Sequence, residues 1–229
     1  MYFKDINHYG DRGLIIDFGI ESSKDVSQEI NAAIIYLKDL KLPTLNTIPS
    51  YNKIVLYFEN TEEKQKSIKT LEIKMKDFRP LDIKRPYKRW NIPACYDPQY
   101  ALDFERIQKL HDLSNLEIIN LHTKKIYYNY YIGFMPGFPY LGEIPSKLIT
   151  PRLSSPRLQI PARSVGIAKE HTCIYPKTSP GGWNIIAQVP FDIFSLDHSR
   201  TSLFLPGDEV ELSAVTQGEF EKIQKKNFL

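Results

Sequence analysis

The chain has 229 residues, of which 42% are hydrophobic, 25% charged and 12% aromatic. This is the composition of a globular protein and excludes a disordered chain. The formal net charge of +3 is too small to indicate nucleic-acid binding. The chain contains no uninterrupted apolar run of about 18 residues, so no membrane span is predicted. The N-terminus lacks the apolar segment of a signal peptide. We therefore expect a cytoplasmic protein that binds neither nucleic acid nor membrane.

The two cysteines also fit a reducing compartment. Cys95 and Cys173 are 78 residues apart and form no CxxC motif. Cytoplasmic reductants keep such thiols unpaired. We expect two free thiols rather than a disulfide.

Residues 1–84 have the pattern of a small α/β domain. Short apolar runs rich in β-branched and aromatic residues predict strands, and apolar residues at helical spacing predict helices. The predicted strands are 13–19 and 53–59, and the predicted helices are 26–37 and 61–75. Ser22 or Ser23 can cap the first of these helices. No catalytic motif lies in this part of the chain.

Two helices are predicted where the second domain begins. Asp97 and Pro98 favour the start of the first helix, because proline suits a first helical turn. Its apolar stripe would consist of Leu102, Ile107 and Leu110. Ser114 and Glu117 form a capping box for the second helix. His122 ends that helix, where a histidine is more often a cap or a packed side chain than a ligand.

Residues from 125 onward are typical of a β domain. The strands predicted from short apolar runs are 126–132, 164–168, 172–176, 183–190 and 208–212. Glycine and proline separate them, which indicates a sandwich or a barrel. The sequence GFMPGFPYLG (133–142) favours neither a helix nor a buried strand, so we expect a loop there. The charged tail 216–229 is expected to fray.

Proline-rich loops single out one region as a candidate site. Residues 121–190 hold nine of the 16 prolines, six of the 11 glycines, and eight basic residues against two acidic ones. Such loops are rigid before binding, and a basic cleft would attract an anion. A second loop, SPGGW (179–183), has the same character. Arg152 and Arg157 lie between the loops, and an arginine fork binds carboxylate or phosphate. The alternative is that these glycines and prolines form barrel corners and that the charges are scattered.

No motif of this chain identifies a reaction. GFMPGF lacks the Gly-Lys-Ser/Thr ending of a P-loop, and SPGGW is not a GxSxG nucleophile elbow. HExxH and Cys/His clusters are missing, so no metal site is predicted. Residue chemistry alone therefore indicates a rigid, basic site of small-molecule size.

Three longer segments resemble a known family. GFMPGFPYLGEIPSKLITPRLSSPRLQIPARSVGIA, IYPKTSPGGWNIIAQVP and LFLPGDEVEL are similar to the KipI family, also described as allophanate hydrolase subunit 1 and as the B-type subunit of 5-oxoprolinase. YGDRGLIIDFG and IPACYD add to this resemblance, which covers about residues 8–212. It implies an α+β fold: a small N-terminal α/β domain (1–84), then a cyclophilin-like β-barrel domain (85–215).

The resemblance also implies an activity and partners. The companions would be a subunit resembling allophanate hydrolase subunit 2 and a barrel-type 5-oxoprolinase subunit. Together they would open the lactam of 5-oxoproline to glutamate, using ATP with Mg at the level of the complex. The residues expected to bind substrate are Gly137, Phe138, Pro139, Tyr140, Ser179, Pro180, Gly181, Gly182 and Trp183. For catalysis we expect His122, Arg152 and Arg157.

Other functions remain open. One branch of the family resembles an inhibitor of a sensor histidine kinase, and an allophanate hydrolase-type amidohydrolase is a further possibility. Prolyl isomerisation rests on barrel analogy alone. The chain also departs from the family pattern PAGSVGIAGGQTGIYP: small or glycine-like positions become Arg163, Lys169, Glu170, His171 and Cys173. Glu143 likewise stands where glycine is common. If this hairpin lines the site, the added bulk and charge would change the substrate or block it; if it faces solvent, nothing follows.

Overall fold

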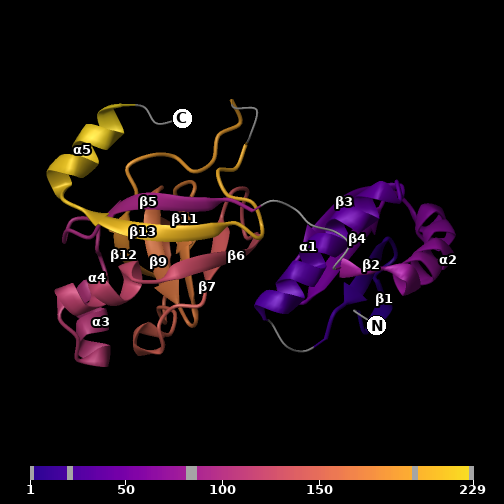
Figure 1. Cartoon of the computed structure of the whole chain (residues 1–229), viewed down its shortest axis with the longest axis horizontal. Coiled ribbons are helices and arrows are strands. Elements are labelled where there is room, and N and C mark those ends of the chain that lie inside the picture. Colours follow the sequence, from indigo (N-terminus) through magenta and orange to yellow (C-terminus); the bar gives the residue numbers. More distant parts are fainter. Residues whose placement is uncertain (1–2, 20–22, 81–86, 198–200, 227–229) are drawn as a thin grey trace. The chain divides into compact units, whose positions relative to one another are not determined.

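The computed structural model describes residues 3–19, 23–80, 87–197 and 201–226. The chain divides into two compact units, Met1–Pro86 and Tyr87–Leu229. The first is a small α/β unit and the second contains a closed barrel, in agreement with the predicted α+β fold class (Figure 1).

The N-terminal unit is a four-stranded antiparallel sheet with two helices. Its elements are β1 (Asp5–Tyr9), β2 (Gly13–Asp17), α1 (Lys24–Asp39), β3 (Thr44–Pro49), β4 (Lys53–Phe58) and α2 (Thr61–Asp77). The strand order is β1-β2-β4-β3, which leaves β1 and β3 at the edges. Residues alternate across each strand, so one face carries the apolar side chains. That face, with Leu14 opposite Leu56, packs against both helices.

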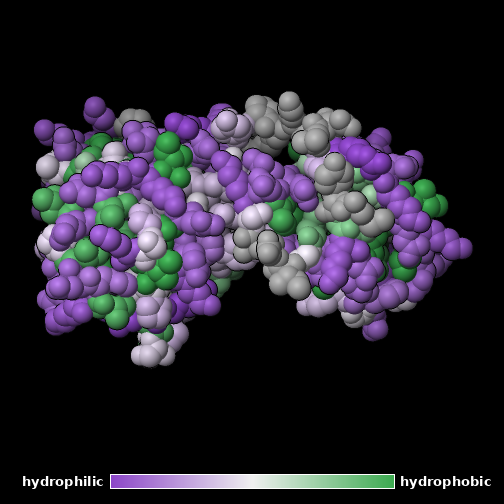
Figure 2. Space-filling view, turned by 60° about the horizontal axis from the view of Figure 1, so that its bottom comes forward, coloured by the Kyte–Doolittle hydropathy of each residue, from purple (hydrophilic) through white to green (hydrophobic). Residues whose placement is uncertain are grey.

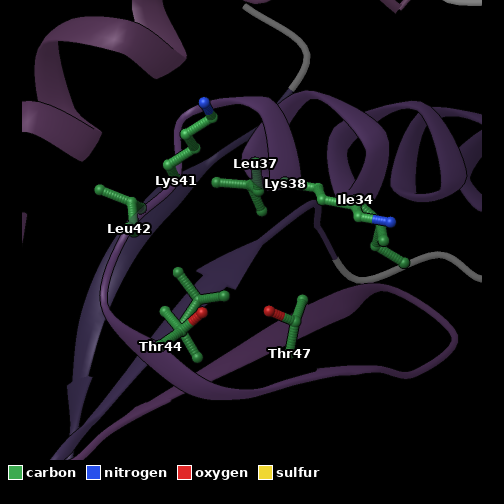
Figure 3. A pocket seen from close by; sticks show the side chains of 8 residues that line it. Ile34, Leu37, Lys38, Lys41, Leu42, Thr44 and Thr47 are labelled. Carbon is green, nitrogen blue, oxygen red and sulfur yellow. The ribbon is translucent and has the colours of Figure 1, made fainter.

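Local sequence explains how both helices begin. The side chain of Ser23 accepts a hydrogen bond from the Val26 backbone N–H, and Asn60 does the same for Glu63. These bonds satisfy N–H groups that a first turn leaves unpaired. Both predicted helices and both predicted strands are confirmed. Ser22, the alternative cap, lies outside the described residues. A cavity opens between α1 and the β3–β4 pair (Figure 3).

The C-terminal unit is built around a closed seven-stranded barrel. Its strands are β5 (Arg89–Cys95), β6 (Ile126–Ile132), β7 (Pro139–Gly142), β9 (Ser164–Ala168), β10 (His171–Ile174), β12 (Asn184–Gln188) and β13 (Glu209–Val215). They close in the order β10-β7-β6-β13-β5-β12-β9, and β5 pairs with β13 in parallel. A separate two-stranded sheet joins β8 (Arg157–Ile160) to β11 (Ser179–Gly181). The short turn η2 (Ser146–Leu148) lies between β7 and β8.

One prediction about the barrel strands needs correction. The segment 133–142 is not all loop, because its last four residues form β7 and pair with β6. The strand β6 is present as predicted, and both of its faces are buried at Tyr127, Tyr128, Asn129 and Tyr130. Tyr127 packs in the barrel core, while Asn129 forms hydrogen bonds with the 205–208 segment.

Three helices complete the C-terminal unit. They are α3 (Phe104–His111), α4 (Asn115–Thr123) and α5 (Gln217–Lys225). The capping box of Ser114 and Glu117 is present, as predicted. The first helix begins later than predicted, since the chain makes a turn after Asp97, and Ile107 alone of the expected stripe is buried. The tail does not fray before residue 226, because Phe220 buries its ring against Tyr100, with ring centroids 4.7 Å apart.

The surface shown in Figure 2 is a mosaic of hydrophilic residues with small, separate hydrophobic patches. Among the described residues, no helix has both the length and the apolar character needed to cross a bilayer.

Candidate functional site

The two glycine- and proline-rich motifs meet in an aromatic cluster. Phe138 and Tyr140 come from the first motif, and Trp183 comes from the second. The Trp183 ring lies 5.8 Å from the rings of both Phe138 and Tyr140, edge to face in each case. Edge-to-face packing is favourable for aromatic rings at this separation. The structure therefore brings together residues that the sequence predicted for one site.

The cluster runs from a buried base to an exposed rim. Phe138 and Tyr175 are buried, with ring centroids 5.1 Å apart. Tyr131 stacks on the half-buried Tyr140 at 4.4 Å and 13°. Phe134 packs on Phe138 at 5.4 Å yet is 64% exposed. A rigid aromatic base with an accessible rim suits a small planar or partly apolar ligand.

Two glycines of the motifs are required by the packing of the protein itself. A Cβ on Gly181 would lie 2.5 Å from the Tyr175 hydroxyl oxygen and 2.7 Å from Ile160. Gly137 has φ +78°, and a Cβ there would lie 2.6 Å from that of Phe194. Side chains at these two positions would clash with the protein itself. At Gly182 the nearest atom would be 3.7 Å away, so a side chain fits there.

Prolines and a serine of the motifs complete this framework. Pro139 is buried in β7 opposite Ile132. Pro180 is exposed within β11, and the Ser179 hydroxyl donates a hydrogen bond to the Pro180 carbonyl at 3.2 Å. These residues hold the loops and offer few side-chain groups of their own.

Arg152 supplies a cation beside the cluster. Its guanidinium carbon lies 5.8 Å from the centroid of the Trp183 ring, within the range of a cation–π contact. Burial raises the pKa of Tyr140, and the nearby charge of Arg152 partly offsets this rise. Arg152 is exposed and forms no salt bridge within the described part of the chain. Its fork is thus available to an anionic ligand.

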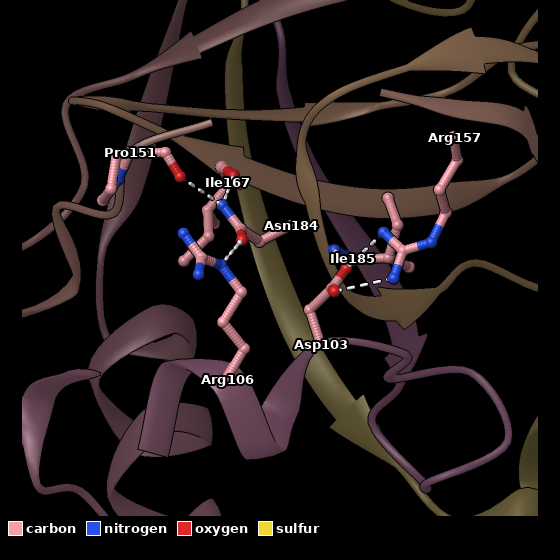
Figure 4. A network of polar contacts seen from close by, with 7 residues as sticks. All are labelled: Asp103, Arg106, Pro151, Arg157, Ile167, Asn184 and Ile185. Carbon is pink, nitrogen blue, oxygen red and sulfur yellow. Dashed lines mark hydrogen bonds and ion pairs between the residues drawn. The ribbon is translucent and has the colours of Figure 1, made fainter. Parts of the chain in front are cut away.

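A polar network (Figure 4) holds the backbone next to Arg152 and next to Trp183. The Asn184 side-chain amide donates to the carbonyls of Pro151 and Ile167 at 3.0 and 3.1 Å, and its oxygen accepts from Arg106 at 2.9 Å. Asn184 follows Trp183, and Pro151 precedes Arg152. One side chain therefore links the two segments that carry the pair.

The network also includes Arg157, which the sequence predicted for catalysis. Its guanidinium donates to both carboxylate oxygens of Asp103 at 2.7 and 2.9 Å. One of those oxygens also accepts from the Ile185 backbone N–H at 2.6 Å. The fork is occupied inside the protein, so Arg157 supports the site and does not offer a free anion-binding group. Sequence reasoning missed Asp103, Arg106 and Asn184 because no motif links residues so far apart.

His122 is also placed differently from its predicted catalytic role. It is completely buried, and its ring nitrogens lie 2.7 Å from the Tyr96 hydroxyl and 3.0 Å from the Thr172 hydroxyl. The Thr172 hydroxyl donates to the Gly166 carbonyl, so it accepts from the histidine. Tyr96 must then donate to Nδ1, and the ring is neutral with its proton on Nε2. A histidine enclosed in this way has no exposed ring atom with which to contact a ligand.

We predict that His122 makes the protein less stable in mild acid. Burial lowers its pKa from 6.5 to about 3. Below pH 6.5 the unfolded chain takes up a proton that the folded chain does not. The free energy of unfolding therefore falls by about 1.4 kcal/mol for each unit by which the pH is lowered. Between pH 7 and 5 this amounts to about 2 kcal/mol. Denaturant unfolding at several pH values measures it.

Replacing His122 alone isolates its contribution to the pH dependence of stability. His171, whose pKa burial also lowers, acts in the same direction. We therefore compare the wild type with His122→Gln, which keeps His171. The variant should be less stable at pH 7 but lose less on acidification. Parallel pH profiles for the two proteins would contradict the assignment.

The altered hairpin lies mostly outside the aromatic cluster. Lys169 and Glu170 are exposed at its tip, and Arg163 donates to the Pro190 carbonyl at 3.3 Å. Arg163 and Lys169 have φ angles of +68° and +50°, in the left-handed region that glycine adopts more readily than other residues. Cys173 packs within the cluster. Both cysteines are free and buried, and burial raises the pKa of each thiol, so neither is an activated nucleophile.

The glycine-rich turns and acidic residues of the described part of the chain do not form a site that fits Mg-ATP. Among the described residues, no three His, Cys, Asp or Glu side chains gather where they could hold a metal ion. The glycine-rich turns face protein atoms at Gly137 and Gly181, as described above, and leave no backbone cradle there for phosphate.

Comparison with solved structures defines the class of the fold. The protein TTHA0988 is 29% identical, with a TM-score of 0.77 over 89% of this chain. This chain spans 40% of the length of TTHA0988. The urea amidolyase of K. lactis has a TM-score of 0.73 at 17% identity, over 97% of this chain and 15% of its own, a likeness of fold alone. Residues 4–204 match the family model of the carboxyltransferase domain, subdomains C and D.

Sequence relatives narrow the class further. The B-type 5-oxoprolinase subunit of Bacillus subtilis (strain 168) is 31% identical over 233 residues, which cover 97% of each chain. The chain therefore belongs to the carboxyltransferase-domain family that includes this 5-oxoprolinase subunit, as its motifs predicted.

Proposed function

We propose that this chain is a subunit of an ATP-dependent 5-oxoprolinase, which opens the lactam of 5-oxoproline to L-glutamate. The observation that carries the proposal is the similarity to the B-type 5-oxoprolinase subunit over 97% of both chains. A match of this extent includes both structural units and both motif loops.

The geometry supports a role in binding an anionic, compact substrate. The Arg152 fork can hold a carboxylate in two-point fashion, or stabilise the negative charge that develops when a lactam carbonyl is attacked. The aromatic faces beside it suit the ring of such a substrate. Neither the buried His122 nor the buried thiols offer a base or nucleophile at this surface.

We infer that the remaining chemistry comes from companion subunits. ATP with Mg supplies the driving force for lactam opening, and we place its site in another chain because the described residues do not fit it. The expected companions are a subunit resembling allophanate hydrolase subunit 2 and a barrel-type 5-oxoprolinase subunit. Inhibition of a histidine kinase remains an expectation from the sequence.

Reconstitution tests the proposal. The three proteins are purified together, and ADP and glutamate formation from 5-oxoproline is measured with each component omitted in turn. We expect activity that requires this chain. A folded complex that forms no glutamate from 5-oxoproline would refute 5-oxoproline as the substrate. Full activity without this chain would refute its role in the complex.

A further inference from the structure

The N-terminal unit contains a second candidate site, in a cavity of about 250 Å³. The cavity lies between the C-terminal half of α1 and the β3–β4 pair (Figure 3). Leu37 and Leu56 provide apolar walls, while Lys38, Lys41 and two threonines provide polar groups. An apolar cavity with a few polar groups is typical of small-molecule sites.

A β-bulge turns two threonines toward this cavity. In a regular strand, residues 44 and 47 would face opposite sides of the sheet. The β3–β4 register shifts between Thr44 and Asn46, so Thr44 stands opposite Phe58 and Thr47 opposite Leu56. Phe58 and Leu56 both belong to the buried face. The extra residue therefore places both threonines on the α1 side, and Figure 3 shows their hydroxyl oxygens turned toward each other.

Two cations stand at the rim of the cavity. Lys38 and Lys41 line it with their stems, and their ammonium groups point outward in Figure 3. Neither lysine has an acidic partner among the described residues, and neither threonine hydroxyl has a hydrogen bond there. Lys41 adopts φ +51°, directly after the helix end, where glycine is the favoured residue. A long cationic side chain thus occupies a backbone position that does not favour it.

We propose that this cavity binds a small monocarboxylate with a compact apolar body. The carboxylate accepts hydrogen bonds from Thr44 and Thr47, and the flexible lysines fold over it. The apolar body packs on Leu37 and Leu56. The volume suits a ligand smaller than a drug-sized molecule. All residues that line this cavity belong to the N-terminal unit, so the proposal does not rest on lactam opening.

Methyl NMR of the full-length protein tests the proposal with hexanoate as the probe. Saturable shifts are expected for the methyl groups of Leu37 and Leu56. Pentylamine carries the same pentyl chain but the opposite charge, and we expect at least about tenfold weaker binding, because the lysines repel it and the carboxylate bonds are lost. Shifts that do not saturate, or equal affinity for the two probes, would overturn the site.

Two variants separate binding from folding. Lys41→Gly removes a cation while relieving a left-handed backbone, so the fold is retained, and hexanoate should bind about fivefold more weakly. Thr47→Val removes one hydroxyl and should weaken binding by about the same factor. The matched control is Lys169→Gly, at φ +50° in the other unit, which makes the same change and should leave the affinity unaltered. Wild-type affinity in both cavity variants would also overturn the proposal.

Discussion

Replacing Arg157 with alanine is expected to lower the free energy of unfolding by about 2 to 3 kcal/mol. Its partner Asp103 has a side chain that is only 5% exposed. Without the guanidinium, this buried carboxylate keeps the Ile185 N–H but loses its countercharge. The Arg157 side chain is 31% exposed, so water can reach the space it leaves, which places the effect below that of a fully buried pair. Denaturant unfolding measures this loss of stability, provided that the slope of the free energy of unfolding against denaturant concentration is the same in both proteins.

Arg89→Ala is a matched control for this prediction. Arg89 also contacts one carboxylate through two nitrogens, at 2.8 and 3.2 Å from Glu209, but its side chain is 57% exposed. Its removal should cost less than about 1 kcal/mol. Equal losses in the two variants would show that the Asp103 pair is worth no more than a surface pair.

The same variant distinguishes two roles for Arg157. A supporting residue should lose activity in proportion to the folded protein that is lost. A residue that contacts substrate should lose activity at temperatures where the variant is fully folded. The occupied fork leads us to expect the first result, although the motif context alone had suggested the second.

Elements with a local sequence signal were predictable. The Ser114–Glu117 box, the cap at Ser23 and the strand at 164–168 depend on side chains within a few residues of one another. By contrast, β1 and β3 are edge strands with largely exposed side chains, so they lack an apolar run. Their existence depends on pairing with β2 and β4, which a linear pattern does not display.

The candidate site was predictable in its motifs but not in its supports. Glycine, proline and aromatic residues marked the two loops, and these do meet. Asp103 and Arg157 are 54 residues apart, and Arg106 and Asn184 are 78 apart, with no shared motif. His122 had the local signal of a helix end, but its burial depends on Thr172, 50 residues away. Polar supports of this kind follow from the closed barrel and are visible only in three dimensions.

Replacing Arg152 with alanine is expected to lower kcat of the reconstituted complex by about 10²- to 10³-fold, the usual effect of removing a group that stabilises developing charge. The exposed guanidinium lies over Trp183 and has no acidic partner in the described part of the chain, so its loss leaves no buried charge behind. The melting temperature should therefore change little. Steady-state kinetics and thermal unfolding of the same preparation compare the two effects.

Two further variants give this result its meaning. Arg152→Lys keeps the charge but not the planar fork, so it should recover part of the lost activity. Lys177→Ala removes an exposed charge from the same basic segment and should leave kcat unchanged, since Lys177 takes no part in the aromatic cluster. Equal losses from Lys177→Ala and Arg152→Ala would mean that general positive charge, rather than a guanidinium held over Trp183, attracts the substrate. A loss confined to Arg152 would place the reacting anion beside the Trp183 ring.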